Sequence, residues 1–129
     1  AEASLSIRPG EFVSLVGPSG CGKTTLLNMV AGLIAVNDGS ISVGGQAPRM
    51  GRPDVSYMFA SDCLLPWRTA LHNAAFGMEL RGVEREERLI RASQLLKEAG
   101  LEGFEEAYAS QLSKGMRQRV ALARTFGLP

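Results

Sequence analysis

The segment Gly-Pro-Ser-Gly-Cys-Gly-Lys-Thr-Thr at residues 17–25 has the spacing G-x-x-x-x-G-K-[ST]. Its glycines let backbone N–H groups approach an anion closely, and a helix that begins after them directs its N-terminal N–H groups toward that anion. Lys23 can reach the β- and γ-phosphates of a nucleotide, and the hydroxyl of Thr24 can ligate Mg²⁺. The segment therefore predicts a phosphate-binding loop with Lys23 as its catalytic residue and Thr24 as its metal ligand. The expected nucleotide contacts are Gly17, Pro18, Ser19, Gly20, Cys21, Gly22, Lys23, Thr24 and Thr25.

The residues on either side of this loop support the interpretation. An apolar run at 12–16 precedes the loop, and residues 25–31 follow it with a helical pattern. This is the strand–loop–helix setting that a phosphate-binding loop needs. The alternative is a glycine turn that only joins a strand to a helix. The fixed positions recur by chance at roughly 0.5% in a chain of this length, so the nucleotide site is favoured.

Length, composition and charge restrict the kinds of protein that this chain can be. With 129 residues, 45% hydrophobic residues and a net charge of +1, the chain is at most one ordinary globular domain, and no nucleic-acid partner is expected. It shows neither a long apolar stretch nor a signal-peptide pattern, so we expect a soluble, cytosolic chain. Cys21 and Cys63 are expected to be reduced thiols, because they are too few for a disulfide scaffold and His72 is the one histidine.

The first half of the chain is predicted to be rich in strands. Alternating or continuous apolar patterns predict strands at 4–7, 12–16, 40–43 and 55–59. A helix is expected at about 23–31, where Gly32 is a suitable C-terminal cap.

The second half has helical periodicity. Residues 70–80 predict one helix, and 84–99 predict a stronger one with acidic residues at its start and Gly100 at its end. The charged face of the second helix is most simply a solvated surface, with a partner site as the alternative.

A second informative segment is Leu-Ser-Lys-Gly-Met-Arg-Gln-Arg-Val-Ala-Leu-Ala-Arg at 112–124. Ser113 is suited to cap a helix whose buried stripe contains Met116, Val120 and Ala123. The plain alternative is an ordinary capped amphipathic helix. The segment resembles the signature L-S-G-G-[QM]-x-Q-R-V-x-[IL]-A-R-A of the ATP-binding subunits of ABC transporters. The resemblance implies that Ser113, Lys114, Gly115 and Met116 also contact nucleotide.

Residues 55–69 narrow the resemblance to a subfamily. They are similar to V-x-Q-[ED]-x-x-L-L-P-W-x-T in importers of nitrate, sulfonate, taurine and related small anions, with Leu64-Leu65-Pro66-Trp67 as the distinctive part. In that family, this loop and the following helix face the transmembrane permease. The alternative is that Trp67 and the leucines merely fill a gap in the core behind Pro66.

The resemblance covers essentially the whole chain and implies an α/β fold, a P-loop NTPase core with a mixed sheet plus a helical lobe. We expect residues 1–68 to form part of the nucleotide-binding core, 69–113 a helical subdomain, and 114–129 the signature helix that returns to the core. The family continues into an apolar strand ending in D-E-P, so the chain is expected to be C-terminally truncated.

The resemblance also implies a function. ATP and Mg²⁺ would bind between two subunits in a head-to-tail dimer, and ATP hydrolysis would drive transport of a small anion through the permease. The protein would then lie at the cytoplasmic face of the inner or plasma membrane. The transported substrate is chosen by the permease and its binding protein, not by this chain.

Two positions depart from the family pattern and keep a second hypothesis open. Ala60 stands where the family has a glutamine that ligates Mg²⁺, and Lys114 stands where it has a glycine close to the partner's γ-phosphate. The D-E-P carboxylates and a switch histidine are not in the sequence. The alternative is therefore a degenerate or truncated nucleotide-binding module without turnover, and the chain alone is expected to be inactive as an ATPase.

Overall fold

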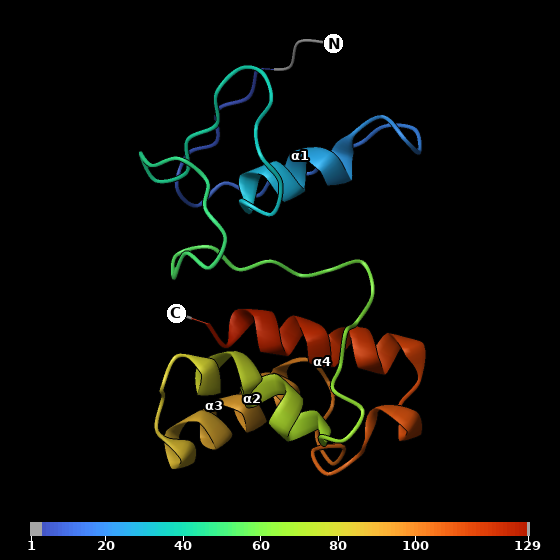
Figure 1. Ribbon diagram of the computed structural model, residues 1–129. Helices are drawn as coiled ribbons and strands as arrows, with labels where there is room; N and C mark the ends of the chain where they lie inside the picture. The colour runs from blue at the N-terminus through green and yellow to red at the C-terminus, as the bar shows by residue number, and fades with distance from the viewer. Residues whose placement is uncertain (1–3, 129) are drawn as a thin grey trace. The chain divides into compact units, whose positions relative to one another are not determined.

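The computed structural model describes residues 4–128, which divide into two compact units (Figure 1). The first unit, Ala1–Met50, contains the helix α1 at Lys23–Val30. The second unit, Gly51–Pro129, contains α2 at Ala70–Leu80, α3 at Arg85–Glu98, the 3₁₀ turn η1 at Ala109–Gln111, and α4 at Lys114–Phe126. The predicted subdivision at residues 68 and 113 stays a prediction.

The second unit has a hydrophobic core made by α2, α3 and α4, which pack on one another (Figure 1). Small side chains let these helices approach closely, most clearly at Gly77 of α2, where an added Cβ would lie 2.8 Å from the side chain of Leu128. The buried core residues are Ala70, Ala74, Ala75, Met78, Ala92, Leu96, Leu101, Leu112, Val120 and Ala123.

The helices begin and end at residues that the sequence identifies. Thr69 caps α2 by accepting from the His72 N–H, and Glu84 caps α3 through its carboxylate. Gly32, Gly82 and Gly100 follow α1, α2 and α3 with φ values of 72°, 75° and 72°. In each case the N–H groups after the helix return to carbonyls of its last turn, an arrangement that favours glycine. The helices predicted at 70–80 and 84–99 are therefore confirmed to within a residue at either end.

The predicted strands are not present in residues 4–128. None of the segments 4–7, 12–16, 40–43 and 55–59 forms a β-ladder there, and the described pairing consists of two isolated bridges, Val43 with Gln46 and Thr69 with Tyr108. An alternating pattern shows which face of a strand is apolar, but hydrogen bonds to a neighbouring strand are what hold it. The regular elements of the described residues are therefore helices alone, and the expected mixed sheet is not found among them.

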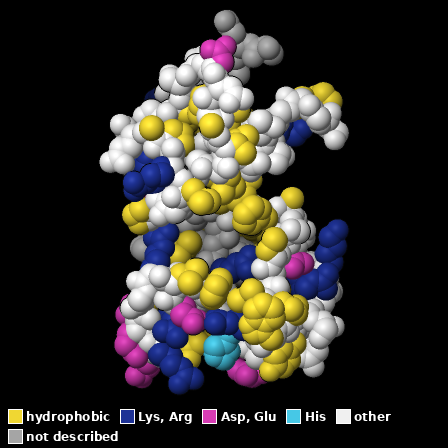
Figure 2. Space-filling view, viewed as in Figure 1, with side chains coloured by type: hydrophobic (Ala, Val, Ile, Leu, Met, Phe, Trp, Pro, Cys, Tyr) yellow, Lys and Arg dark blue, Asp and Glu magenta, His cyan; other side chains and the backbone are white. Residues whose placement is uncertain are grey.

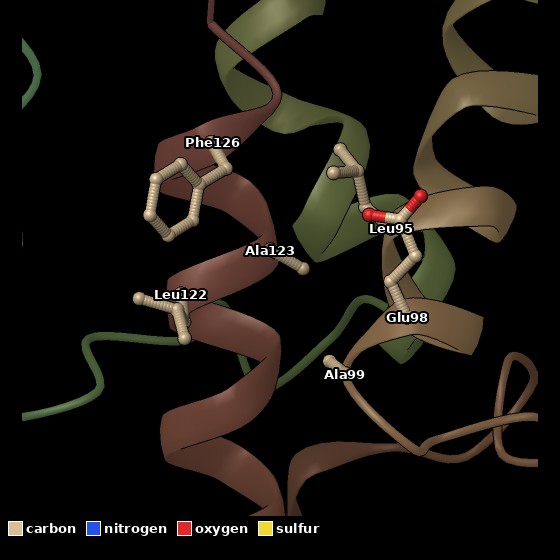
Figure 3. Close-up of a pocket in the computed structure, with 6 residues that line it drawn as sticks. All are labelled: Leu95, Glu98, Ala99, Leu122, Ala123 and Phe126. Atoms are coloured by element: carbon tan, nitrogen blue, oxygen red, sulfur yellow. The ribbon is translucent and has the colours of Figure 1, made fainter. Parts of the chain in front are cut away.

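The first unit buries little apolar surface. Ala31 is the one buried residue in the part of this unit that the structure describes, whereas Phe12 and Val16 are 97% and 91% exposed. Close packing occurs after α1, where a Cβ on Gly32 would lie 2.4 Å from the Arg49 carbonyl carbon. Hydrophobic side chains reach the surface of both units (Figure 2). Within 4–128, we find no helix with the length and apolar character needed to cross a bilayer.

Candidate functional site

The predicted phosphate-binding residues lie at the N-terminus of α1. Gly20 and Gly22 have φ values of 81° and 98°, in the left-handed region that glycine adopts without strain. Gly22 is the residue directly before the helix, and no side chain caps it. The first N–H groups of a helix have no partner within the helix, so the N–H groups at this end are suited to bind an anion.

A hollow of about 270 Å³ adjoins this helix end. An added Cβ at Gly20 or Gly22 would meet no atom within 4 Å, so both glycines border open space. The hollow combines a helix N-terminus, one ammonium group and hydroxyl side chains, a set of donors that fits a polyphosphate. Its lining residues are Ser19, Gly20, Gly22, Lys23, Thr24 and Thr25.

Lys23 bonds to the loop in front of it. Its Nζ donates to the carbonyl oxygens of Gly17 and Pro18 at 2.8 and 2.7 Å and lies 3.5 Å from the Cys21 Sγ. The ammonium group is therefore held beside the hollow by acceptors that are weaker than phosphate oxygens. Thr24 is exposed at the same helix end, where its hydroxyl is accessible to a cation.

The residues 113–116 begin α4 in the second unit. The Ser113 side chain accepts from the Met116 N–H at 3.2 Å, as the capping prediction required. Met116 packs against the core together with buried Val120 and Ala123, which confirms the predicted apolar stripe. Lys114 is exposed, and a Cβ on Gly115 would meet nothing within 4 Å. The start of α4 therefore presents a cation and a bare backbone to solvent.

The loop around Leu64–Trp67 begins against the hydrophobic core and ends at the surface. Leu64 packs against the core, whereas Trp67 is 71% exposed. Arg68 lies over the Phe76 ring at 5.0 Å and pairs with Glu79 at 2.6 Å, which fixes the chain directly after Trp67. Leu64 thus contributes to the core, but the Trp67 indole does not. An exposed indole on a fixed turn is suited to contact a partner.

Asn73 holds this turn in place, although the sequence analysis missed it. Its side chain is 1% exposed, and its Oδ1 accepts from the Leu65 N–H at 2.8 Å. Its Nδ2 lies 3.1 Å from the carbonyl oxygens of Leu65, Arg68 and Thr69. One buried amide therefore satisfies several backbone groups of the turn. The available signal was an asparagine followed directly by two alanines inside a mostly apolar helix.

Asp62 is a second residue that the sequence analysis did not single out. Its carboxylate accepts from the Arg117 Nε at 3.0 Å and from the Leu64 N–H at 3.3 Å. Burial alone would raise its pKa, but these hydrogen bonds and the positive charges of Arg117 and Arg124 together lower the pKa of Asp62. The carboxylate is therefore ionised at neutral pH and pairs with α4.

The structure separates the predicted site residues into two groups. The phosphate-loop residues share one hollow in the first unit, whereas Ser113–Met116 and the Leu64–Trp67 loop belong to the second unit. His72 is half-buried, and its Nδ1 lies 2.8 Å from the Thr69 hydroxyl. Within residues 4–128, no three His, Cys, Asp or Glu side chains lie together as a metal site.

Comparison with known proteins defines the class. The sequence model of the ABC transporter family matches residues 1–127, so the chain belongs to the ABC transporter family. Its ATP-binding relatives include the taurine import ATP-binding protein TauB of Escherichia coli K12, 46% identical over 123 residues, or 95% of this chain and 48% of TauB. An uncharacterised ABC transporter ATP-binding protein of Methanocaldococcus jannaschii is 47% identical over 122 residues, or 95% of this chain and 46% of that protein.

A solved structure supports the same assignment. The ATP-binding cassette MJ0796, a dimer in a post-hydrolysis state bound to ADP and Pi, aligns with a TM-score of 0.79 and 36% identity. The alignment covers 95% of this chain and 59% of that one. The chain therefore has the fold of part of an ABC ATPase domain, and it spans about half the length of the curated relatives it matches.

Proposed function

We propose that the chain binds ATP through the hollow at the N-terminus of α1, as part of the ATP-binding subunit of an ABC importer. The observation that carries this proposal is the position of the Lys23 Nζ, beside a hollow that Gly20, Gly22 and a helix N-terminus also border. The loop backbone and Lys23 would hold the phosphates, and Thr24 would ligate Mg²⁺. ATP would supply the phosphoryl group, and Lys23 would neutralise the negative charge of the phosphates and position them.

Calorimetric titration of the 129-residue chain with Mg-ATP tests the proposal. Lys23→Ala should weaken binding by at least about tenfold, because it removes a charge-assisted contact to phosphate. The matched control is Lys97→Ala, since Lys97 pairs with Glu102 at 2.8 Å on the second unit. Equal ATP affinity in the wild-type and Lys23→Ala chains would refute the site.

The start of α4 would complete a site on a second subunit. Ser113, Lys114, Gly115 and Met116 combine a helix N-terminus with a cation and an open backbone, a set that attracts a partner's γ-phosphate. The related cassette MJ0796 is dimeric and holds ADP and Pi. We therefore expect a head-to-tail dimer in the complete protein.

The complete protein would drive import through a permease. The exposed Trp67 on a turn fixed by Asn73 offers the permease a rigid apolar contact. Relatives named as taurine importers favour a sulfonate or a similar small anion as the transported substrate. This arrangement would place the ATPase at the cytoplasmic face of the membrane as a peripheral subunit. Trp67→Ala should then lower transport and leave ATP affinity unchanged.

The 129-residue chain by itself should bind ATP without hydrolysing it. In the described part of the first unit, Glu11 pairs with Arg8 and Asp38 accepts from the Gly39 N–H, so both carboxylates of residues 4–50 are engaged away from the hollow. No carboxylate among residues 4–50 is then placed to orient a water for attack on the γ-phosphate. A phosphate-release assay should give the background rate, and turnover that Lys23→Ala removes would identify a base within the chain.

Two residues favour the second candidate, a nucleotide-binding module without turnover. Ala60 offers no ligand to Mg²⁺, and the long side chain of Lys114 occupies the exposed start of α4. In the complete protein, Ala60→Gln and Lys114→Gly should each raise permease-coupled ATPase activity if these residues limit turnover. Unchanged rates in both reversions would remove the support for the second candidate.

A further inference from the structure

The loop at 61–65 lies along helix α4 and is tied to it at two places. The Arg117 Nε donates to the Asp62 carboxylate at 3.0 Å. The Arg124 guanidinium donates to the Asp62 and Cys63 carbonyl oxygens at 2.7 and 2.8 Å. These contacts join residues that are 55 to 62 positions apart in the sequence.

The two arginines fix the direction of the loop as well as its position. Arg117 and Arg124 are seven residues apart, so they share one face of α4 and are separated by about 10 Å along its axis. Arg117 also donates to the Leu112 carbonyl oxygen at 2.9 Å, directly before the Ser113 cap. The Arg117 contact is therefore linked to the start of α4, and the Arg124 contacts lie near its end.

The backbone of Cys63 indicates that these contacts determine the loop conformation. Cys63 has φ = 47°, a left-handed value that costs a non-glycine residue on the order of 1 kcal/mol. Such a conformation persists where the surrounding contacts over-determine it. Arg124 holds the carbonyl of this very residue, and the Asp62 carboxylate holds the Leu64 N–H on its other side.

We propose that Asp62, Arg117 and Arg124 form a polar clamp that makes the loop and α4 move as one body, so that a shift of the α4 N-terminus reaches Trp67. The clamp extends the proposed function, since it would connect the nucleotide-facing start of α4 to the permease-facing turn. Asn73 fixes the far side of the same turn on α2. The three clamp residues act by positioning and do not contact nucleotide.

Amide exchange of the 129-residue chain tests the clamp. In an Arg117→Gln/Arg124→Gln variant, the N–H groups of Leu64 and Leu65 should exchange at least about fivefold faster, the loss expected for partly exposed charge pairs. The α2 amides should keep their exchange rates. Trp67 is the one tryptophan of the chain, so its fluorescence anisotropy should fall at the same time.

Two further variants control this measurement. Arg119→Gln removes an arginine of the same helix whose guanidinium faces Gly100, and it should leave the loop unchanged. Arg117→Lys keeps the positive charge, so the Leu64 and Leu65 amides should stay mostly protected in it. This variant remains informative even if the double variant loses part of its helical structure. Unchanged exchange at Leu64 and Leu65, or an equal increase throughout the second unit, would overturn the clamp. The Lys23→Ala titration tests the proposed function, whereas amide exchange tests the clamp. Either proposal can therefore be refuted without the other.

The complete protein with its permease supplies a readout that a purely structural role would not change. The double variant should hydrolyse ATP at the basal rate of the wild type but transport at least about threefold less substrate per ATP, because motion of α4 no longer reaches the turn. Proportional losses of hydrolysis and transport, or no loss of either, would refute transmission through the clamp.

Discussion

In the proposed function, Lys23 is the side chain that prepares the site for an anion. Its ammonium group is kept by the Gly17 and Pro18 carbonyls, so it neither extends into solvent nor collapses onto a carboxylate. A phosphate that enters the hollow gains a charged donor that is already close. If the proposed site is correct, contacts from the backbone of the loop itself hold this donor in place before the anion binds.

The position of Cys21 beside this lysine leads to a prediction on chemical modification. Cys21 is exposed with its Sγ 3.5 Å from the Lys23 Nζ, at the edge of the phosphate hollow. Alkylation with N-ethylmaleimide should therefore block ATP binding, and saturating ATP should slow the alkylation of Cys21. Cys63 is also exposed but belongs to the second unit, so it serves as the internal control. Mass spectrometry should show that ATP protects Cys21 alone; equal protection of both thiols would contradict the site.

Asn73 is expected to be the most sensitive polar residue of the second unit. Its replacement by alanine removes the partner that the Leu65 N–H and the Arg68 carbonyl oxygen have in this partly buried turn. Such a loss costs about 2–3 kcal/mol. Urea unfolding of Asn73→Ala should show this decrease, whereas the exposed Gln94→Ala on α3 should remain near wild type. A change below about 0.5 kcal/mol would mean that the turn is held by other contacts.

Asp62 gives the second unit a defined response to acid. Because its folded pKa is lowered, its contribution to stability is fully present above the unfolded value of about 3.9 and is lost as the pH falls through the folded pKa. The difference in urea midpoint between wild type and Asp62→Asn should be constant near neutrality and shrink in acid. The pKa values of Glu79 and Glu84 are also lowered, by the Arg68 hydrogen bond and by helix-capping N–H groups, but these effects cancel in the comparison. A difference that persists at the lowest pH would exclude the ion pair as its source.

At the scale of the elements, the sequence predicted the helices well because their signals are local. A cap such as Ser113, a periodic apolar stripe and a terminal glycine such as Gly100 are each read within a few residues. Strands depend on partners that are distant in sequence, and the predicted segments at 12–16 and 55–59 have no ladder in the described residues. The phosphate-binding role of residues 17–25 rests on an equally local pattern and stays a prediction. The clamp residues were missed because their partners lie 55 to 62 positions away. Asn73 was missed although its partners lie within eight positions, because a polar residue inside a helix is more often exposed than buried.

The cap of α4 provides a prediction at this scale. Ser113→Ala removes the acceptor for the Met116 N–H and should lower the free energy of unfolding of the second unit by about 1 kcal/mol. Ser113→Asp should retain the stability, since aspartate is an equally good cap and its charge favours a helix N-terminus. Denaturant unfolding monitored by far-ultraviolet circular dichroism measures both. If the alanine variant is as stable as wild type, the start of α4 frays without effect on the core.

At the scale of the whole molecule, the two units differ in what can stabilise them. The second unit has the apolar cluster of α2, α3 and α4, whereas Ala31 is the one buried residue among 4–50. Apolar burial supplies most of the folding free energy, and α1 with eight residues is too short to persist alone. The helical unit should therefore hold most of the stability, and the unit with the phosphate loop should depend on additional contacts.

Hydrogen exchange and sedimentation of the 129-residue chain together test this difference. Amides of α2, α3 and α4 should be protected, and those of residues 4–50 should exchange much faster. The exposed Phe12 and Val16 should also promote association at high concentration, because apolar surface that the unit leaves uncovered is buried between copies. Mg-ATP should slow amide exchange in the first unit selectively. It binds the folded form of the loop, so it shifts the folding equilibrium of this unit toward the folded state. One sharp transition for both units, with a monomer at every concentration, would show that the first unit is stabilised by more than the burial seen here.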